Sequence, residues 1–144
     1  MTISFWKDKS KKQVDPDLFS GRADVLAKKI YDEQRQSKGE KANKPTQIRK
    51  FYDEVLRFDS MLKSNPADFD NILPYLKMLN AKAAYAMGRD LVSKGFKDFI
   101  SNSLNQINDK DDFDAFAGIF EAFMGYYKFN DEKGETLLNQ GGRR

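Results

Sequence analysis

Apolar residues recur at helical spacing in five segments of this chain, and no segment shows the alternating apolar and polar pattern of a β-strand. Apolar residues three, four and seven positions apart fall on one face of an α-helix, where they can pack against other helices. The first two segments span roughly 19–36 and 46–64. The third runs from a cap at Asp68 or Asp70 towards Gly95, the fourth follows Gly95, and the fifth follows the acidic run at 108–112. The sequence therefore predicts an all-α fold, a compact bundle of about five helices.

The predicted core is built from the apolar face of each segment. Its members are Phe19, Ala23, Leu26 and Ile30; Ile48, Phe51, Tyr52, Val55 and Leu62; Ile72, Leu76, Leu79, Ala83 and Met87; Phe96, Phe99, Ile100 and Ile107; and Phe113, Phe116, Ala117, Phe120, Phe123, Met124 and Tyr127. We expect residues 19–130 to form a single helical-bundle domain. Residues 1–18 are expected to be a flexible basic N-terminal extension, and residues 131–144 a frayed C-terminal tail. The polar segment 37–44 (SKGEKANK) is expected to be a mobile basic loop.

Histidine and cysteine are both absent from the 144 residues. Zinc sites and nucleophile–base pairs usually depend on these residues, so we predict no catalytic residue, no metal site and no cofactor. Asp109, Asp111, Asp112 and Asp114 do not fit an EF-hand loop, which needs glycine at position 6 and glutamate at position 12, and helix capping explains them better. No apolar run approaches the roughly 20 residues of a membrane-spanning helix. The lack of cysteine suits a cytoplasmic protein.

Charge is distributed unevenly along the chain. Residues 1–50 carry 13 basic and 7 acidic side chains, whereas residues 101–144 carry 5 basic and 8 acidic ones. This asymmetry fits a polyanionic partner, a head-to-tail contact between copies, or an ordinary solvated surface.

The third segment carries a second organised surface opposite its core face. Lys82, Tyr85 and Arg89 fall on one helical stripe, joined by Met78 one turn earlier. Lys82 and Arg89 are seven residues apart, about 10 Å along the helix axis, which spans a few nucleotides of single-stranded backbone. Tyr85 lies between them as a possible platform for a stacked base. The alternative is that the two cations are solvated and that Tyr85 packs on a neighbouring helix.

The second segment carries a similar arrangement. Lys50 and Arg57 are seven residues apart and share a face, and Arg49 flanks the core stripe. These cations are further candidates for phosphate contacts. Arg49 and Arg89 could instead be structural and pair with Glu121 of the fifth segment.

Three stretches together resemble one family, the small helical subunit of the type III-A (Csm-type) CRISPR effector complex. The stretches are PTQIRKFYDEV (45–55), YLKMLNAKAAYAMGRD (75–90) and FEAFMGYYKF (120–129). They are similar to the family's T-x-x-Q-I-R-K segment, its Y-L-x-x-x-x-x-Y-x-x-G-R pattern and its M-E-A-x-V-A-Y-x-K-F ending. Phe120 replaces a frequent methionine, Gly125 replaces a small alanine, and residues 1–18 have no counterpart.

The resemblance implies a non-catalytic helical bundle that supports antiviral RNA interference. Several copies would stack beside the backbone subunit that holds the CRISPR RNA, and their basic surfaces would line the channel in which target RNA pairs with the guide. By position, Arg49, Lys50 and Arg89 are the candidate RNA contacts that the resemblance implies. Lys77 and Lys82 lie in the same segment as Arg89. The expected partners are CRISPR RNA, target RNA, the other Csm-type subunits and copies of the chain itself, with no membrane.

Two other functions remain open from the sequence. A DNA-binding helical regulator would use TQIRKFYDEVLR (46–57) as a recognition helix, but Ile48, Phe51 and Val55 commit much of that helix to the core. A purely structural adaptor would contact only protein, through the apolar fifth helix.

Overall fold

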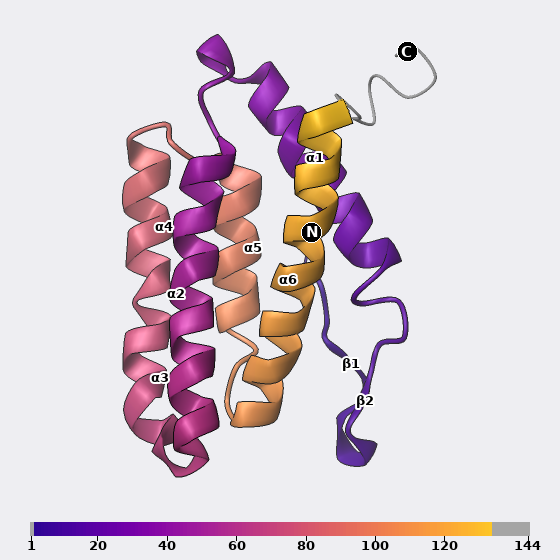
Figure 1. Cartoon of the computed structure of the whole chain (residues 1–144), viewed down its shortest axis with the longest axis vertical. Helices are drawn as coiled ribbons and strands as arrows, with labels where there is room; N and C mark the ends of the chain where they lie inside the picture. The colour runs from indigo at the N-terminus through magenta and orange to yellow at the C-terminus, as the bar shows by residue number, and fades with distance from the viewer. Residues whose placement is uncertain (1, 134–144) are drawn as a thin grey trace.

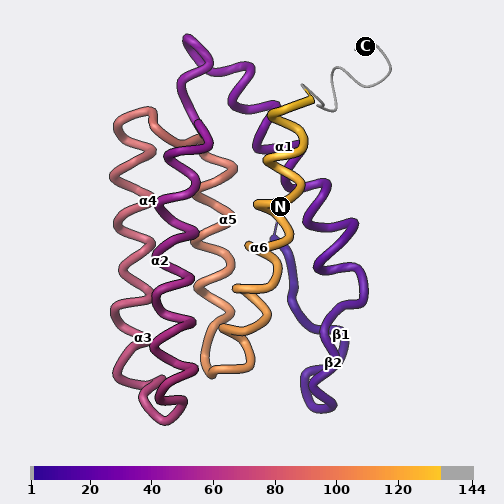
Figure 2. The backbone as a smooth tube through the Cα atoms, viewed as in Figure 1, coloured from indigo at the N-terminus to yellow at the C-terminus, as the bar shows by residue number. Residues whose placement is uncertain are grey.

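The computed structural model describes residues 2–133, and its helices form an all-α bundle with a small two-stranded sheet at one end (Figure 1). The α-helices are α1 (Gly21–Gln36), α2 (Pro45–Ser64), α3 (Phe69–Lys77), α4 (Leu79–Gly88), α5 (Lys94–Leu104) and α6 (Lys110–Lys133). Only Met78 separates α3 from α4, and its φ of −63° and ψ of −17° are helical, so the two form one nearly continuous rod beside α2 (Figure 2). The predicted bundle of about five helices is therefore confirmed.

Residues 2–18 pack against the bundle, which differs from the flexible extension expected for residues 1–18. Strand β1 (Trp6–Asp8) pairs antiparallel with β2 (Gln13–Val14) across a short 3-10 turn, η1 (Lys9–Lys11). Ile3, Phe5 and Leu18 are buried in the core. Gln106, just after α5, donates to the Ile3 carbonyl at 2.6 Å and accepts from the Phe5 amide at 3.3 Å. Short strands of this kind leave little alternating pattern, so the sequence did not reveal them.

The centre of the core is an aromatic cluster that joins α2, α5 and α6. Phe96 of α5 contacts Phe51 of α2 with ring centroids 5.3 Å apart, and Phe99 meets Phe120 of α6 edge-on at 5.5 Å. The prediction that Phe19 lies in the core was wrong. This residue is 45% exposed, because α1 begins only at Gly21. Its ring lies against Gly118, where a Cβ atom would approach the ring to 2.6 Å. Most of the other predicted core residues are buried.

The boundary between α4 and α5 lies before Gly95 rather than at it. Ser93 is the N-cap of α5, and its hydroxyl accepts a hydrogen bond from the Phe96 amide at 3.3 Å. Gly95 is buried in the first turn, where the Glu33 carboxylate lies so close that a Cβ atom would meet it at 2.4 Å. The chain therefore turns at 89–93, and Gly95 serves close packing against α1.

The segment expected to be a mobile loop at 37–44 is held in place by Asn43. This residue is fully buried, and its side chain donates to the Ile30 carbonyl at 3.1 Å and to the Ser93 hydroxyl at 2.8 Å. Its own amide donates to the Leu91 carbonyl at 2.9 Å. Asn43 adopts a left-handed conformation with φ of 62°, which asparagine tolerates better than most residues. These bonds fix the start of α2 relative to the end of α4, and so position the two helices that form the candidate site.

The expectation of a frayed tail at 131–144 falls largely outside the described residues. Residues 131–133 complete α6.

Candidate nucleic-acid interface

A groove of about 480 Å³ runs between α2 and α4 on the surface of the bundle. Its lining residues are Gln47, Lys50, Phe51, Asp53, Glu54, Leu79, Lys82, Tyr85, Ala86 and Leu91. Apolar side chains from the core edge form part of this lining, and two lysines, two carboxylates, a glutamine and a tyrosine supply its polar groups. The groove thus combines apolar surface with mixed charge.

Helix α2 contributes one side of the groove because its residues divide between two faces. Ile48, Phe51 and Val55 are buried against the bundle. Lys50, Glu54 and Arg57 are spaced by four and three residues, so they project from a neighbouring face of the helix towards α4. Lys50 and Glu54 line the groove.

Helix α4 contributes Lys82 and Tyr85, which lie beside its buried residues Leu79 and Ala86 on the wall of the groove. The Tyr85 side chain is 65% exposed. Arg89, at the end of α4, donates to the Tyr85 hydroxyl at 3.0 Å, and its guanidinium lies 5.8 Å from the centre of the ring. Tyr85 therefore does not pack into a neighbouring helix, and Arg89 holds its ring at the surface.

Glu54 is the point where the basic side chains of the two helices meet. Its Oε1 atom accepts from Arg57 Nη2 at 3.0 Å within α2 and from Lys82 Nζ at 3.3 Å across the groove. The hydrogen bond from Arg57 lowers the pKa of Glu54 below its ordinary value of 4.5, and Lys82 adds to this effect against the opposing effect of burial. Glu54 is therefore ionised at neutral pH and links Arg57 to Lys82.

Two candidate residues from the sequence do not join this groove. Arg49 leaves α2 about 100° from Lys50, because successive residues of a helix are rotated by that angle. Its guanidinium pairs with Asp53 at 3.4 Å and lies 6.0 Å from the Tyr52 ring, rather than forming the suggested pair with Glu121. Lys77 is half-buried at the end of α3, outside the lining of the groove. The groove and its border thus gather Lys50, Arg57, Lys82, Tyr85 and Arg89.

The profile of the Csm2 Type III-A family matches residues 16–133 of the chain. The chain belongs to the Csm2 Type III-A family. It is accordingly a small subunit of the type III-A CRISPR complex. Comparison with curated proteins and with solved structures gives no match. The Csm2 match begins after both strands of the N-terminal hairpin, so the hairpin lies outside the matched range.

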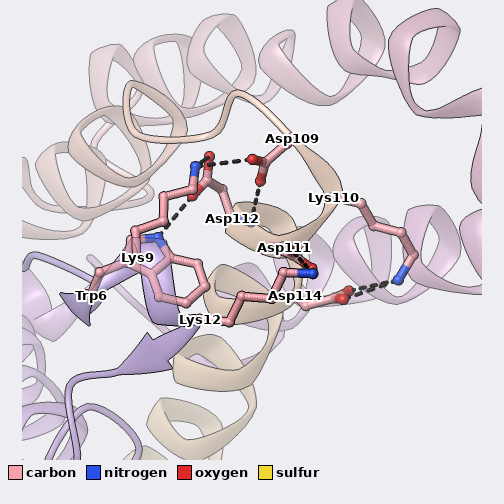
Figure 3. A network of polar contacts seen from close by, with 8 residues as sticks. All are labelled: Trp6, Lys9, Lys12, Asp109, Lys110, Asp111, Asp112 and Asp114. Carbon is pink, nitrogen blue, oxygen red and sulfur yellow. Dashed lines mark hydrogen bonds and ion pairs between the residues drawn. The ribbon is translucent and has the colours of Figure 1, made fainter.

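The acidic cluster of this Csm2-family chain acts as a helix cap and as an anchor for the hairpin (Figure 3). Asp109, which directly precedes α6, accepts from the Asp112 amide through Oδ1 at 2.9 Å, as an N-cap residue does, and Asp112 Oδ2 accepts from the Asn108 amide at 2.9 Å. Asp112 also accepts from the Trp6 indole at 2.8 Å and pairs with Lys9 at 2.9 Å. The predicted capping role is confirmed for Asp109, and Asp111 and Asp112 lie in the first turn of α6, whereas Asp114 pairs with Lys110. Within residues 2–133, no group of three or more acidic side chains is arranged to hold a metal ion.

The described helices of the Csm2-family chain include none that is both long and apolar enough to cross a membrane.

A second groove, of about 510 Å³, lies between α1 and α6. Phe19, Phe129 and Tyr126 contribute to its lining, and Phe129 is more than half exposed. This groove lies on helices other than α2 and α4.

Sequence reasoning missed Glu54 and Asp53 as members of the groove. The spacing of Glu54 and Arg57 could have indicated their ion pair, because residues three apart on a helix are neighbours. The contact between Glu54 and Lys82 joins positions 28 residues apart in two helices, and no local pattern predicts it. The sequence thus supplied the cations of the groove without the carboxylate that joins two of them.

Proposed function

We propose that the groove between α2 and α4 binds the sugar–phosphate backbone of RNA, in the channel where target RNA pairs with the guide. The observation that carries this proposal is the convergence of Lys50 and Lys82 with the exposed ring of Tyr85 in one groove. Cations paired with an accessible aromatic ring are typical of surfaces that bind single-stranded nucleic acid without reading its sequence.

In this proposal each side chain has a distinct task. Lys50 and Lys82 neutralise phosphates, which contributes affinity but no sequence information. Tyr85 offers a face for one unpaired or terminal base, and such stacking contributes about 1–3 kcal/mol. Arg89 keeps the Tyr85 ring at the surface through the hydroxyl contact and adds positive charge beside it. Base pairing with the guide would then supply the sequence specificity, as in other RNA-guided effectors.

We further propose that the subunit is non-catalytic, works in the cytoplasm and acts in several copies. One groove with two or three cations gives weak, salt-sensitive binding. Copies stacked along one RNA would combine these weak contacts through a high effective concentration, so that the array holds RNA that a single subunit releases.

The test is a titration of the full-length chain into a labelled single-stranded RNA at two salt concentrations. Lys50→Ala/Lys82→Ala should weaken binding about tenfold and lower the salt slope by about 0.7 for each phosphate that the variant no longer neutralises. The matched control is Lys63→Ala/Lys128→Ala, which removes two lysines outside the groove that pair with Asp59 and Glu132. Equal weakening in both variants would show that total charge, rather than the groove, governs binding.

Duplex DNA of equal length separates this function from that of a DNA-binding regulator. The burial of Ile48, Phe51 and Val55 leaves α2 with few side chains for reading base edges, so we expect single-stranded RNA to bind more tightly than duplex DNA. The reverse preference would favour the regulator.

A second function, contact with protein subunits, is supported by the groove between α1 and α6. Phe19 and Phe129 are both large, apolar and substantially exposed there, as is typical of a protein-binding surface. We propose that this groove meets the backbone subunit or another copy of the chain. Phe129→Ser should then reduce retention of the subunit in the reconstituted complex while leaving RNA binding by the free chain unchanged.

A further inference from the structure

We infer that Glu54 occupies the place of an RNA phosphate in the groove between α2 and α4, and thereby keeps the affinity of the single subunit for RNA low. This inference rests on the proposed RNA-binding function of the groove and adds a regulatory element to it.

The geometry around Glu54 is that of an anion site already filled from within the chain. Arg57 approaches the carboxylate with Nη2 at 3.0 Å from Oε1 and with Nε at 3.4 Å from Oε2, so it contacts both oxygens. Lys82 approaches Oε1 from the other helix at 3.3 Å. Arginine binds carboxylate and phosphate with the same planar fork, and lysine serves either anion as a point charge. A phosphate oxygen in the position of the Glu54 carboxylate would therefore find the same donors.

The arrangement is specific to Glu54 among the acidic residues of α2 that form described ion pairs. Asp53 pairs with Arg49 and Asp59 pairs with Lys63, in both cases between residues of the same helix. Glu54 alone of these three joins cations from two helices, at the wall of a groove. Its role is thus not explained by the ordinary pairing of charges along one helix.

The contacts of Glu54 are open to exchange. The Lys82 and Arg57 side chains are each more than half exposed, and the Glu54 side chain is 29% exposed. Exposed ion pairs are weak because water and salt screen them, so a polyanion can compete for the two cations. When RNA binds, a phosphate then replaces the Glu54 carboxylate as the partner of the two cations. In the free subunit, Arg57, Lys82 and Glu54 together carry one net positive charge rather than the two of the cations alone.

Low affinity in the free subunit has a physical consequence in an assembly. A single chain that bound RNA tightly would be occupied by any cellular RNA before it reached the complex. With Glu54 in place, stable binding requires several grooves aligned on one strand, where effective concentration compensates for the weakness of each.

The test is the variant Glu54→Gln in the full-length chain, titrated with the same single-stranded RNA at two salt concentrations. Glutamine has nearly the same shape but no charge, so Lys82 and Arg57 are released for phosphate. We expect binding to tighten about three- to tenfold, and the salt slope to steepen by about 0.7 for one additional neutralised phosphate. The matched control, Asp59→Asn, makes the same change of net charge on the same helix away from the groove and should bind like the unmodified chain.

The outcomes separate this inference from the function on which it rests. If Glu54→Gln binds no more tightly than Asp59→Asn, or binds more weakly than the unmodified chain, the inference is wrong. Lys50→Ala/Lys82→Ala tests the groove itself. If that variant weakens RNA binding while Glu54→Gln leaves it unchanged, the RNA-binding function is supported and only the proposed role of Glu54 is contradicted. If neither substitution changes binding relative to its control, both proposals are overturned.

Discussion

Asp112 and Glu54 are both carboxylates that join two parts of the fold, but their surroundings differ. Asp112 is buried and binds the Trp6 indole, the Lys9 ammonium and the Asn108 amide, so it fastens the N-terminal hairpin to the start of α6. Glu54 is partly exposed, and its described partners are the ends of two long side chains, Arg57 and Lys82. A buried carboxylate with fixed donors is costly to disturb, whereas an exposed one can exchange partners with solvent or a ligand. Burial, rather than charge pairing itself, therefore decides which of the two stabilises the fold.

Among the substitutions that test this comparison, Asp112→Ala is expected to change the free energy of unfolding most. The substitution leaves the Trp6 indole and the Asn108 amide without their acceptor. It should lower the free energy of unfolding by about 2–3 kcal/mol. Chemical denaturation measures this change, and the emission of Trp6, the only tryptophan of the chain, should shift to the red if the hairpin separates from α6.

The control for that prediction is Asp114→Ala. Asp114 pairs only with Lys110 among its described contacts, on the same helix and at the surface. A loss of stability as large as that of Asp112→Ala would contradict the distinction between buried and exposed carboxylates.

The stability that Asp112 contributes to the fold is expected to depend on pH. Burial by itself raises the pKa of Asp112, but the hydrogen bonds from Lys9, the Asn108 amide and Trp6 outweigh it and hold that pKa below its ordinary value of 3.8. A carboxyl group whose pKa is lower in the folded state stabilises the fold fully above the unfolded pKa and loses that contribution as pH falls through the folded pKa. The chain should therefore exceed Asp112→Asn in stability by about 1–2 kcal/mol near neutral pH. This advantage should be constant down to about pH 5 and shrink below about pH 4, as measured by denaturation at each pH; an advantage that grew on acidification would contradict the assignment.

A smaller effect is expected from Trp6→Phe. Phenylalanine keeps an aromatic ring beside the hairpin but cannot donate to Asp112, so the free energy of unfolding should fall by about 1 kcal/mol. The double variant Trp6→Phe/Asp112→Ala should then be less destabilised than the sum of the two single variants. Simple additivity in this double-mutant cycle would show that the two side chains do not interact.

The smallest effect on stability is expected from Glu54→Gln. Because its ion pairs are exposed, the free energy of unfolding should change by no more than about 0.5 kcal/mol. Thermal and chemical denaturation of this variant beside Asp112→Asn would test the comparison directly. Equal destabilisation of the two would mean that Glu54 fastens α2 to α4 as firmly as Asp112 fastens the hairpin.

The fold class and most of the core could be predicted from the sequence because helical periodicity is a local property. The spacing of Ile48, Phe51 and Val55 already defines the buried face of α2, whichever helix covers it. The same reasoning identified Lys82, Tyr85 and Arg89 as a surface stripe, and the structure confirms their exposure. It failed for Phe19, which lies before the first turn of α1, and for Ile3 and Phe5, whose segment is too short to show a period.

The candidate site could be predicted only in part, for a related reason. Lys50 and Lys82 are 32 positions apart, and they share a groove only because the anchoring of Asn43 and the core packing fix α2 beside α4. Arg49 was expected beside Lys50 at the site, but its guanidinium lies by Asp53 and the Tyr52 ring, since one residue of helix rotates a side chain by about 100°.

The sequence by itself thus determined which face of each helix is buried and which is charged, because these depend on neighbours within two turns of the same helix. Only the tertiary structure decided that Glu54 meets Lys82 and that Asp112 meets Trp6, 28 and 106 positions away. Such contacts depend on how whole helices pack, and packing is set by the sum of many core side chains rather than by the residues that finally touch.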